Sequence, residues 1–127
     1  MNESNLQRLI TLHVPKSVRI FRNNTGMGWI GQVVSKTPTT ITLKNPRPLH
    51  AGLCTGSSDL IGWKSVVITP DMVGKTIAAF TAVEVKTSSG RATADQLNFI
   101  EQVRKAGGIA GIVRSPEEAR NFLESYL

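Results

Sequence analysis

The sequence is poor in cysteine, histidine and long apolar runs. Its single cysteine, Cys54, excludes an internal disulfide and suits a reducing compartment. The two histidines, His13 and His50, are too isolated to predict a zinc site. No apolar run reaches the roughly 20 residues of a membrane-spanning helix, and residues 1–5 lack the pattern of a signal peptide. We therefore expect a cytoplasmic protein with no membrane partner.

Acidic residues are also scarce, and the imbalance of charge is confined to the first half of the chain. There are 15 Lys and Arg against nine Asp and Glu, a net charge of +6. Residues 1–64 hold eight basic and two acidic residues, whereas residues 65–127 hold seven of each sign. An uneven basic surface is typical of proteins that bind a polyanion. A basic domain without such a partner is the alternative at this point.

Hydrophobic periodicity predicts a single α/β domain over residues 1–127. The crossover from one strand through a helix to the next predicts a parallel strand pair. A hairpin is expected around residues 24–26, and residues 35–56 are expected to be mostly irregular, with Thr39–Leu43 as a candidate short strand. Leu97, Ile100 and Val103 form the expected buried stripe of the central helix, and Cys54 is expected to be buried. Helices are predicted at 3–13, 93–106 and 116–126, and strands at 17–23, 28–34, 59–69, 77–86 and 109–113.

Two charged motifs indicate the chemistry. Asp59 follows a Gly-Ser-Ser turn, and Glu84 and Lys86 alternate with valines on a predicted strand. The alternation places Glu84 and Lys86 on one face of that strand. Two charges on one face of an apolar strand are costly unless they are paired or hold an ion. A solvated ion pair and an ordinary turn are the alternatives for each motif alone. Together, two carboxylates and a lysine suit a metal-dependent phosphodiester hydrolase.

The ordered set of motifs resembles the virus-type replication-repair nuclease (VRR-NUC) domain, a branch of the PD-(D/E)xK nuclease superfamily. The resemblance implies a restriction-endonuclease-like α/β fold. This fold has an αβββαβ core, with a mixed sheet flanked by helices, and here an extra C-terminal helix. The motifs are Gly56-Ser57-Ser58-Asp59-Leu60, Glu84-Val85-Lys86-Thr87, Gly90-Arg91, Gln96, Gly107-Gly108-Ile109-Ala110-Gly111, and, near the N-terminus, Glu3 and Arg22-Asn23-Asn24-Thr25-Gly26.

The resemblance also implies roles for individual residues. Asp59 and Glu84 are the expected metal ligands, with the backbone carbonyl of Val85 and the carboxylate of Glu3 as further donors. Hard oxygen ligands favour Mg²⁺ or Mn²⁺. Lys86 is expected to position the attacking water or to stabilise the phosphate. Gln96 is expected either to orient Lys86 or the water, or to cap the start of its helix. The candidate DNA-binding residues are Arg19, Arg22, Asn23, Lys36, Lys44, Arg47 and Arg91.

The implied function is a DNA endonuclease of replication or repair, specific for branched DNA such as Holliday junctions. A phage or bacterial protein acting as a homodimer in the host cytoplasm is expected. The dimer interface is predicted either in residues 35–56 or on the apolar face of helix 116–126, with Phe122, Leu123 and Tyr126. Ile100 occupies a position at which recombination-type relatives often carry tyrosine, which argues against that subclass. A non-catalytic basic DNA-binding module is the alternative function.

Overall fold

The computed structural model describes residues 2–125, which form a mixed α/β protein with three α-helices and three two-stranded sheets. The strands pair as β1–β4, β2–β3 and β5–β6. The single mixed sheet expected from the sequence is therefore not seen among these residues. In chain order the elements are α1 (Glu3–His13), β1 (Val18–Arg22), β2 (Gly26–Lys36), β3 (Ile41–Ala51), β4 (Leu60–Lys64), the 3-10 helix η1 (Pro70–Met72), β5 (Thr81–Val85), α2 (Ala94–Lys105), β6 (Ile109–Val113) and α3 (Pro116–Glu124).

The chain folds as two compact units. We call the first the hairpin unit; it comprises the chain up to Val14 together with Ile20–Ile61. We call the second the α/β unit; it comprises Pro15–Arg19 together with the chain from Gly62 onward. Among the helices of residues 2–125, none is both long enough and apolar enough to cross a membrane.

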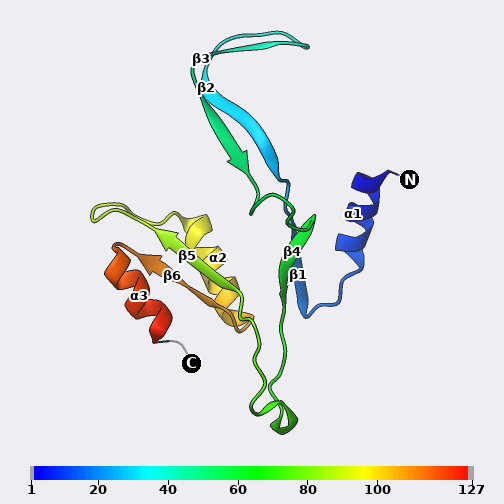
Figure 1. Ribbon diagram of the computed structural model, residues 1–127, viewed down its shortest axis with the longest axis vertical. Coiled ribbons are helices and arrows are strands. Elements are labelled where there is room, and N and C mark those ends of the chain that lie inside the picture. Colours follow the sequence, from blue (N-terminus) through cyan, green and yellow to red (C-terminus); the bar gives the residue numbers. More distant parts are fainter. Residues whose placement is uncertain (1, 126–127) are drawn as a thin grey trace. The chain divides into compact units, whose positions relative to one another are not determined.

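The hairpin unit is dominated by the long antiparallel ribbon of β2 and β3 (Figure 1). The expectation of an irregular segment over residues 35–56 was wrong, since β3 occupies half of it. The predicted hairpin between the first two strands was also wrong, because β1 pairs with β4. The tip is closed by Thr37, whose backbone N–H donates to the carbonyl of Thr40 at 2.8 Å. Cys54 is exposed rather than buried.

Two features explain why the sequence pattern did not predict this ribbon. Pro46 and Pro48 lie within β3, and they are tolerated because a strand with a free edge needs fewer N–H donors. The register is interrupted twice, which disturbs the alternation of apolar and polar residues. At the first interruption, a Cβ added to Gly31 would lie 2.9 Å from the carbonyl oxygen of Lys44, so only glycine fits there.

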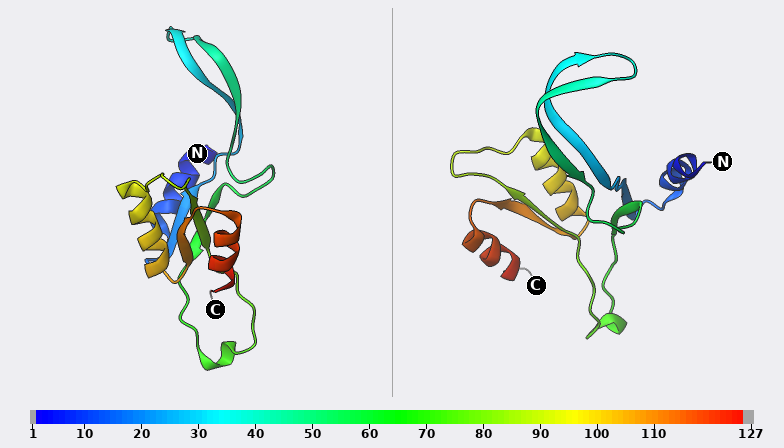
Figure 2. Two further views of the ribbon diagram at one scale, coloured as in Figure 1. Left: turned by 90° about the vertical axis from the view of Figure 1, so that its left-hand side faces the viewer. Right: turned by 45° about the horizontal axis from the view of Figure 1, so that its top comes forward.

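The α/β unit is built on the parallel pair of β5 and β6, as predicted. Helices α2 and α3 lie on opposite faces of this pair (Figure 2). The core lies under α2, where Ile100, Val103 and Ala110 are buried. Leu97, expected in the same stripe, is instead 51% exposed. On the other face, Phe122 of α3 packs so closely on Gly111 that an added Cβ would lie 2.8 Å from its ring.

Candidate active site

Strand β5 carries Glu84 near its end, and Lys86 directly follows the strand. Both side chains are partly buried, with 30% of Glu84 and 19% of Lys86 exposed. The Nζ of Lys86 lies 3.3 Å from the Oε1 of Glu84. The expected placement of both charges on one face of the strand is therefore observed. They form an ion pair that is better shielded from water than the surface pairs Lys105–Glu101 and Arg120–Glu124.

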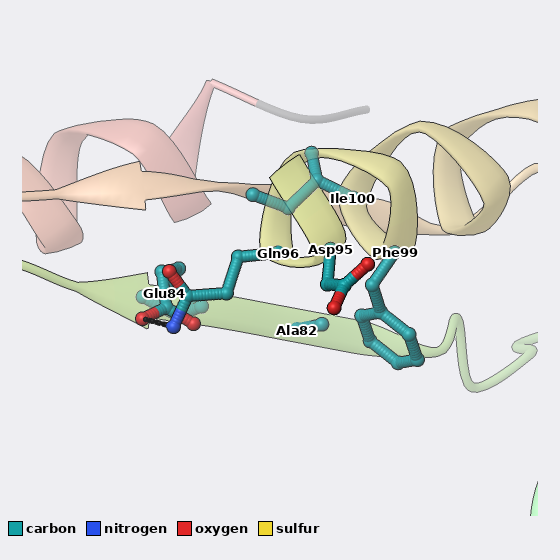
Figure 3. Close-up of a pocket in the computed structure, with 7 residues that line it drawn as sticks. Ala82, Glu84, Asp95, Gln96, Phe99 and Ile100 are labelled. Carbon is teal, nitrogen blue, oxygen red and sulfur yellow. Dashed lines mark hydrogen bonds between the residues drawn. The ribbon is translucent and has the colours of Figure 1, made fainter. Parts of the chain in front are cut away.

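Gln96 reaches this pair from the first turn of α2. Its Nε2 donates a hydrogen bond to Oε1 of Glu84 at 2.9 Å, which Figure 3 shows as a dashed line. Its Oε1 accepts from the backbone N–H of Thr93 at 2.9 Å, while its own N–H donates to Oγ1 of Thr93 at 3.1 Å. This capping box fixes the amide with its donor end toward Glu84. Of the two roles that the sequence left open for Gln96, the cap at the start of the helix is observed. The hydrogen bond that its amide donates goes to Glu84, not to Lys86.

Both contacts of the Glu84 carboxylate fall on Oε1. Among residues 2–125 no hydrogen bond or ion pair involves Oε2. This oxygen is therefore the atom of Glu84 that can accept a further ligand. The arrangement holds the carboxylate in one orientation, because two donors from different elements fix its position.

The carbonyl of Val85 lies on the outer edge of β5. The carbonyl of Phe80 accepts from the N–H of Ile109, and the N–H of Lys86 donates to the carbonyl of Val113, so even-numbered residues of β5 point toward β6. Successive peptide groups point to opposite edges of a strand, so the peptide groups of Val85 point away from β6. β5 has no second neighbouring strand within the described chain. The Val85 carbonyl is thus positioned as an oxygen donor one residue from Glu84.

A hollow of about 420 Å³ opens beside Glu84 between β5 and α2. Figure 3 shows Asp95 and Phe99 extending from α2 toward the strand beside Ala82. The charged and amide groups of the hollow lie toward the start of α2, and the rest of its wall is apolar. The lining residues are Ala82, Val83, Glu84, Asp95, Gln96, Phe99 and Ile100.

The loop between β5 and α2 is held by Arg114, which was not among the residues predicted from the sequence. Nη1 of Arg114 donates to the carbonyls of Thr87 and Gly90, at 2.5 and 2.7 Å. Arg114 follows β6, so its position in the parallel pair brings it to the loop after β5. The Gly-Gly-Ile-Ala-Gly motif that precedes it was the available signal. Arg91, a predicted DNA-binding residue, is exposed on the same loop.

The other predicted metal ligands, Asp59 and Glu3, belong to the hairpin unit. Both are exposed, and Glu3 lies in the first turn of α1. The carbonyl of Asp59 accepts from the N–H of Asn23 at 2.8 Å. The side chain of Asn23 donates to Oγ of Ser57 at 2.7 Å and accepts from the N–H of Leu53 at 2.9 Å. Asn23 thus closes the turn that precedes Asp59.

Four of the remaining predicted DNA-binding residues lie on exposed strand positions. Lys36, Lys44 and Arg47 lie along the ribbon of β2 and β3, opposite Ile41, Gln32 and Ile30. Arg19 lies on β1 and is exposed. Arg22 is tied to α1, since its Nη2 donates to Oγ of Ser4 at 2.6 Å.

The donor set suits a hard cation rather than zinc. Within residues 2–125, no group of three or more His, Cys, Asp or Glu side chains is gathered closely enough to hold a metal. Mg²⁺ does not require such a cage, because it keeps several waters and is commonly held by one or two carboxylates and the substrate phosphate. Oε2 of Glu84 and the Val85 carbonyl fit this mode of binding.

Comparison with known families places most of the chain in one of them. The model of the VRR-NUC domain matches residues 27–117 of the 127 residues. The match includes Asp59, Glu84, Lys86 and Gln96, and it begins after Glu3, Arg19, Arg22 and Asn23. We found no significant match among curated proteins or among solved structures.

Proposed function

The chain belongs to the family of VRR-NUC domains, whose members are nucleases, and on this premise we propose that it is a metal-dependent DNA endonuclease. The observation that carries the proposal is the triad of Glu84, Lys86 and Gln96. A carboxylate held by two donors beside an exposed hollow is a position for a reacting group rather than for packing. The parallel pair and α2 would then belong to a PD-(D/E)xK core.

We assign the following roles. Oε2 of Glu84 and the carbonyl of Val85 would hold Mg²⁺ or Mn²⁺, and the sequence pattern alone adds Asp59 and Glu3. When bound, the cation supplies stabilisation of negative charge on the phosphate. Lys86 holds a positive charge 3.3 Å from Glu84, where its ammonium can donate to a phosphate oxygen or to the attacking water. Gln96 positions Glu84 through its amide.

The role of Gln96 can be separated from its capping role. We expect Gln96→Glu to retain the capping box, since glutamate also accepts from the N-cap N–H. The cleavage rate should nevertheless fall at least tenfold, because the amide that donates to Glu84 is replaced by a second carboxylate. Thr93→Ala should instead cost about 1 kcal/mol of stability while the Gln96 bond to Glu84 is kept. Urea unfolding and cleavage rates of both variants test this. Equal loss of activity in both would contradict a separate role for the Gln96 donor.

DNA affinity is assigned to the basic residues of the hairpin unit and to Arg19 of β1. We expect replacement of Lys36, Lys44 and Arg47 by glutamine to reduce the slope of log affinity against log salt by about one unit for each phosphate that is no longer neutralised. Replacement of Lys105 and Arg120, which are ion-paired on exposed helix faces, serves as the control. Fluorescence anisotropy with labelled duplex at several salt concentrations measures the slope. An unchanged slope would show that the ribbon does not contact phosphates.

We further propose that the protein acts as a homodimer on branched DNA. Two symmetric cuts in a four-way junction suit a two-fold dimer. Of the two predicted interfaces, residues 35–56 are favoured, because Ile41 exposes more than half of its surface there, and Trp29 and Val33 do so on the paired strand β2. On α3, Phe122 already packs on Gly111, and Tyr126 lies outside the described residues.

Cleavage assays with and without metal test the proposed function. Labelled junction, flap and linear duplex are incubated side by side with Mg²⁺ or Mn²⁺, or with a chelator, and the protein is sized by light scattering. We expect metal-dependent cleavage with a preference for the junction, and a dimer in solution. Binding without cleavage in either metal would favour the alternative, a non-catalytic DNA-binding module. A monomer that cuts linear duplex as readily as junctions would contradict the assignment to branched DNA.

A further inference from the structure

The hollow beside Glu84 has an apolar wall, which binding of a metal ion and a phosphate does not require. Its polar end is formed by Glu84, Gln96 and Asp95. Its remaining surface is apolar and includes Phe99, a residue that is 40% exposed. A phosphate and a hydrated cation need charged and polar surroundings. An aromatic and aliphatic wall next to the candidate catalytic carboxylate therefore points to a different part of the substrate.

We propose that this hollow binds one unpaired nucleobase next to the phosphate that is cleaved. The inference rests on the proposed nuclease function and adds to it the feature of DNA that is recognised. A base is the flat, apolar-faced part of a nucleotide, and it lies within one nucleotide of the attacked phosphate. Because the base must leave its partner to enter the hollow, DNA with unpaired bases near the cut is favoured over continuous duplex.

Phe99 is the expected stacking surface. Its ring meets Trp63 edge to face, with centroids 6.4 Å apart and an interplanar angle of 72°. This contact fixes the ring orientation, so little freedom is lost when a base stacks on it. Ala82, Val83 and Ile100 complete the apolar wall around it. Stacking on an aromatic side chain is tolerant of sequence, which suits recognition of an unpaired base rather than of one base type.

Asp95 adds a preference among bases. Its exposed carboxylate only accepts hydrogen bonds when ionised, and Figure 3 places it on the same side of α2 as Phe99. Adenine, cytosine and guanine carry an exocyclic amino group that can donate to it, whereas the one ring N–H that thymine can donate lies between two carbonyl oxygens, which a carboxylate repels. The hollow should therefore favour cytosine over thymine at this position, and Asp95→Asn should remove most of that preference.

The experiment uses the full-length protein, Mg²⁺ and a branched DNA whose cleavage position has been mapped. Single abasic sites are placed one at a time on each side of the cleaved bond. We expect one position, and only one, to slow cleavage by about tenfold, the loss of one stacked base. Phe99→Leu, which keeps an apolar side chain against Trp63, should slow cleavage of the intact DNA by a similar factor and abolish the effect of the abasic site. Leu97→Ala, an exposed apolar change elsewhere on α2, should alter neither.

The outcomes separate this inference from the function on which it rests. If cleavage is equally fast whichever position is abasic, the proposed base-binding role of the hollow is wrong, but the nuclease assignment still stands. The base-binding role of the hollow would also be wrong if Phe99→Leu slowed the cleavage of intact DNA and of abasic DNA by the same factor. Phe99 would then act only through packing, and the nuclease assignment would still stand. Failure to cleave any DNA with either metal would overturn the nuclease assignment and the inference with it.

Discussion

Replacing Glu84 with glutamine should lower the rate of DNA cleavage by about a thousandfold, the upper end of what one lost electrostatic group costs. Glutamine has the same shape, and its carbonyl oxygen can still accept from Gln96 and from Lys86. The fold should therefore persist while the charge that holds the cation is lost. Single-turnover cleavage in saturating Mg²⁺ measures the rate, and thermal unfolding followed by circular dichroism measures the fold.

Glu101→Gln is the matched control for this change. Glu101 lies on α2 and pairs with Lys105 at 3.1 Å, but it is 60% exposed and does not line the hollow. An exposed pair of this kind contributes little, about 0.3–0.5 kcal/mol. We expect the cleavage rate of this variant to equal that of the unchanged protein. Near-normal cleavage by Glu84→Gln would show that the active site lies elsewhere.

The second large effect is expected for Lys86→Met. Methionine retains much of the aliphatic stem but removes the ammonium group that lies 3.3 Å from Oε1 of Glu84. The loss of one donor to a charged phosphate oxygen or its attacking water should slow cleavage by about a hundredfold. Binding of Mn²⁺ should be retained, because Oε2 of Glu84 and the carbonyl of Val85 are unchanged.

Lys105→Met provides the comparison, since it removes an exposed lysine from the same unit. We expect cleavage by this control to be unaffected. Measuring Mn²⁺ binding by calorimetry alongside cleavage distinguishes the two predicted losses. Glu84→Gln should lose both binding and cleavage, whereas Lys86→Met should lose cleavage alone. If Lys86→Met weakened Mn²⁺ binding as much as Glu84→Gln does, the assigned role of Lys86 would be wrong.

The sequence predicted those parts of the fold that local chemistry determines. Helix α2 begins one residue after Thr93, as its capping pattern indicated, and α3 begins after Ser115, whose side chain accepts from the N–H of Glu118. Strand β6 was predicted with its observed ends, because Gly108 and Ser115 bound a short apolar run. Parallel pairing with β5 followed from the length of the crossover.

The parts that were missed depend on contacts distant in sequence. No local pattern in β3, which contains Pro46 and Pro48, predicts that it pairs with β2. The glycine that permits the first interruption of the strand register, Gly31, lies on β2 rather than on β3. Leu97 continues the apolar period of α2, yet it is half exposed, and the sheet on which α2 packs has only two strands within the described residues. Sheet width is a property of the whole chain.

The candidate site likewise has parts that local patterns predicted and parts that depend on contacts distant in sequence. Alternation along one strand predicted the shared face of Glu84 and Lys86, and the capping pattern predicted the position of Gln96. The hydrogen bond between Gln96 and Glu84 joins two elements through the packing of α2 on β5, which no local pattern encodes. The hollow and the contribution of Phe99 to it have the same origin. The metal-ligand role of Asp59 stays a prediction from the sequence.

The most direct test of the account is a crystal soaked with Mn²⁺ and measured at a wavelength that reveals manganese by anomalous scattering. We predict a peak about 2.1 Å from Oε2 of Glu84 and at similar distance from the carbonyl oxygen of Val85, the spacing expected for a small hard cation. From the sequence pattern, a carboxylate oxygen of Asp59 should complete the protein ligands. A peak remote from Glu84, or its persistence in Glu84→Gln, would contradict the assignment of this carboxylate as the metal ligand.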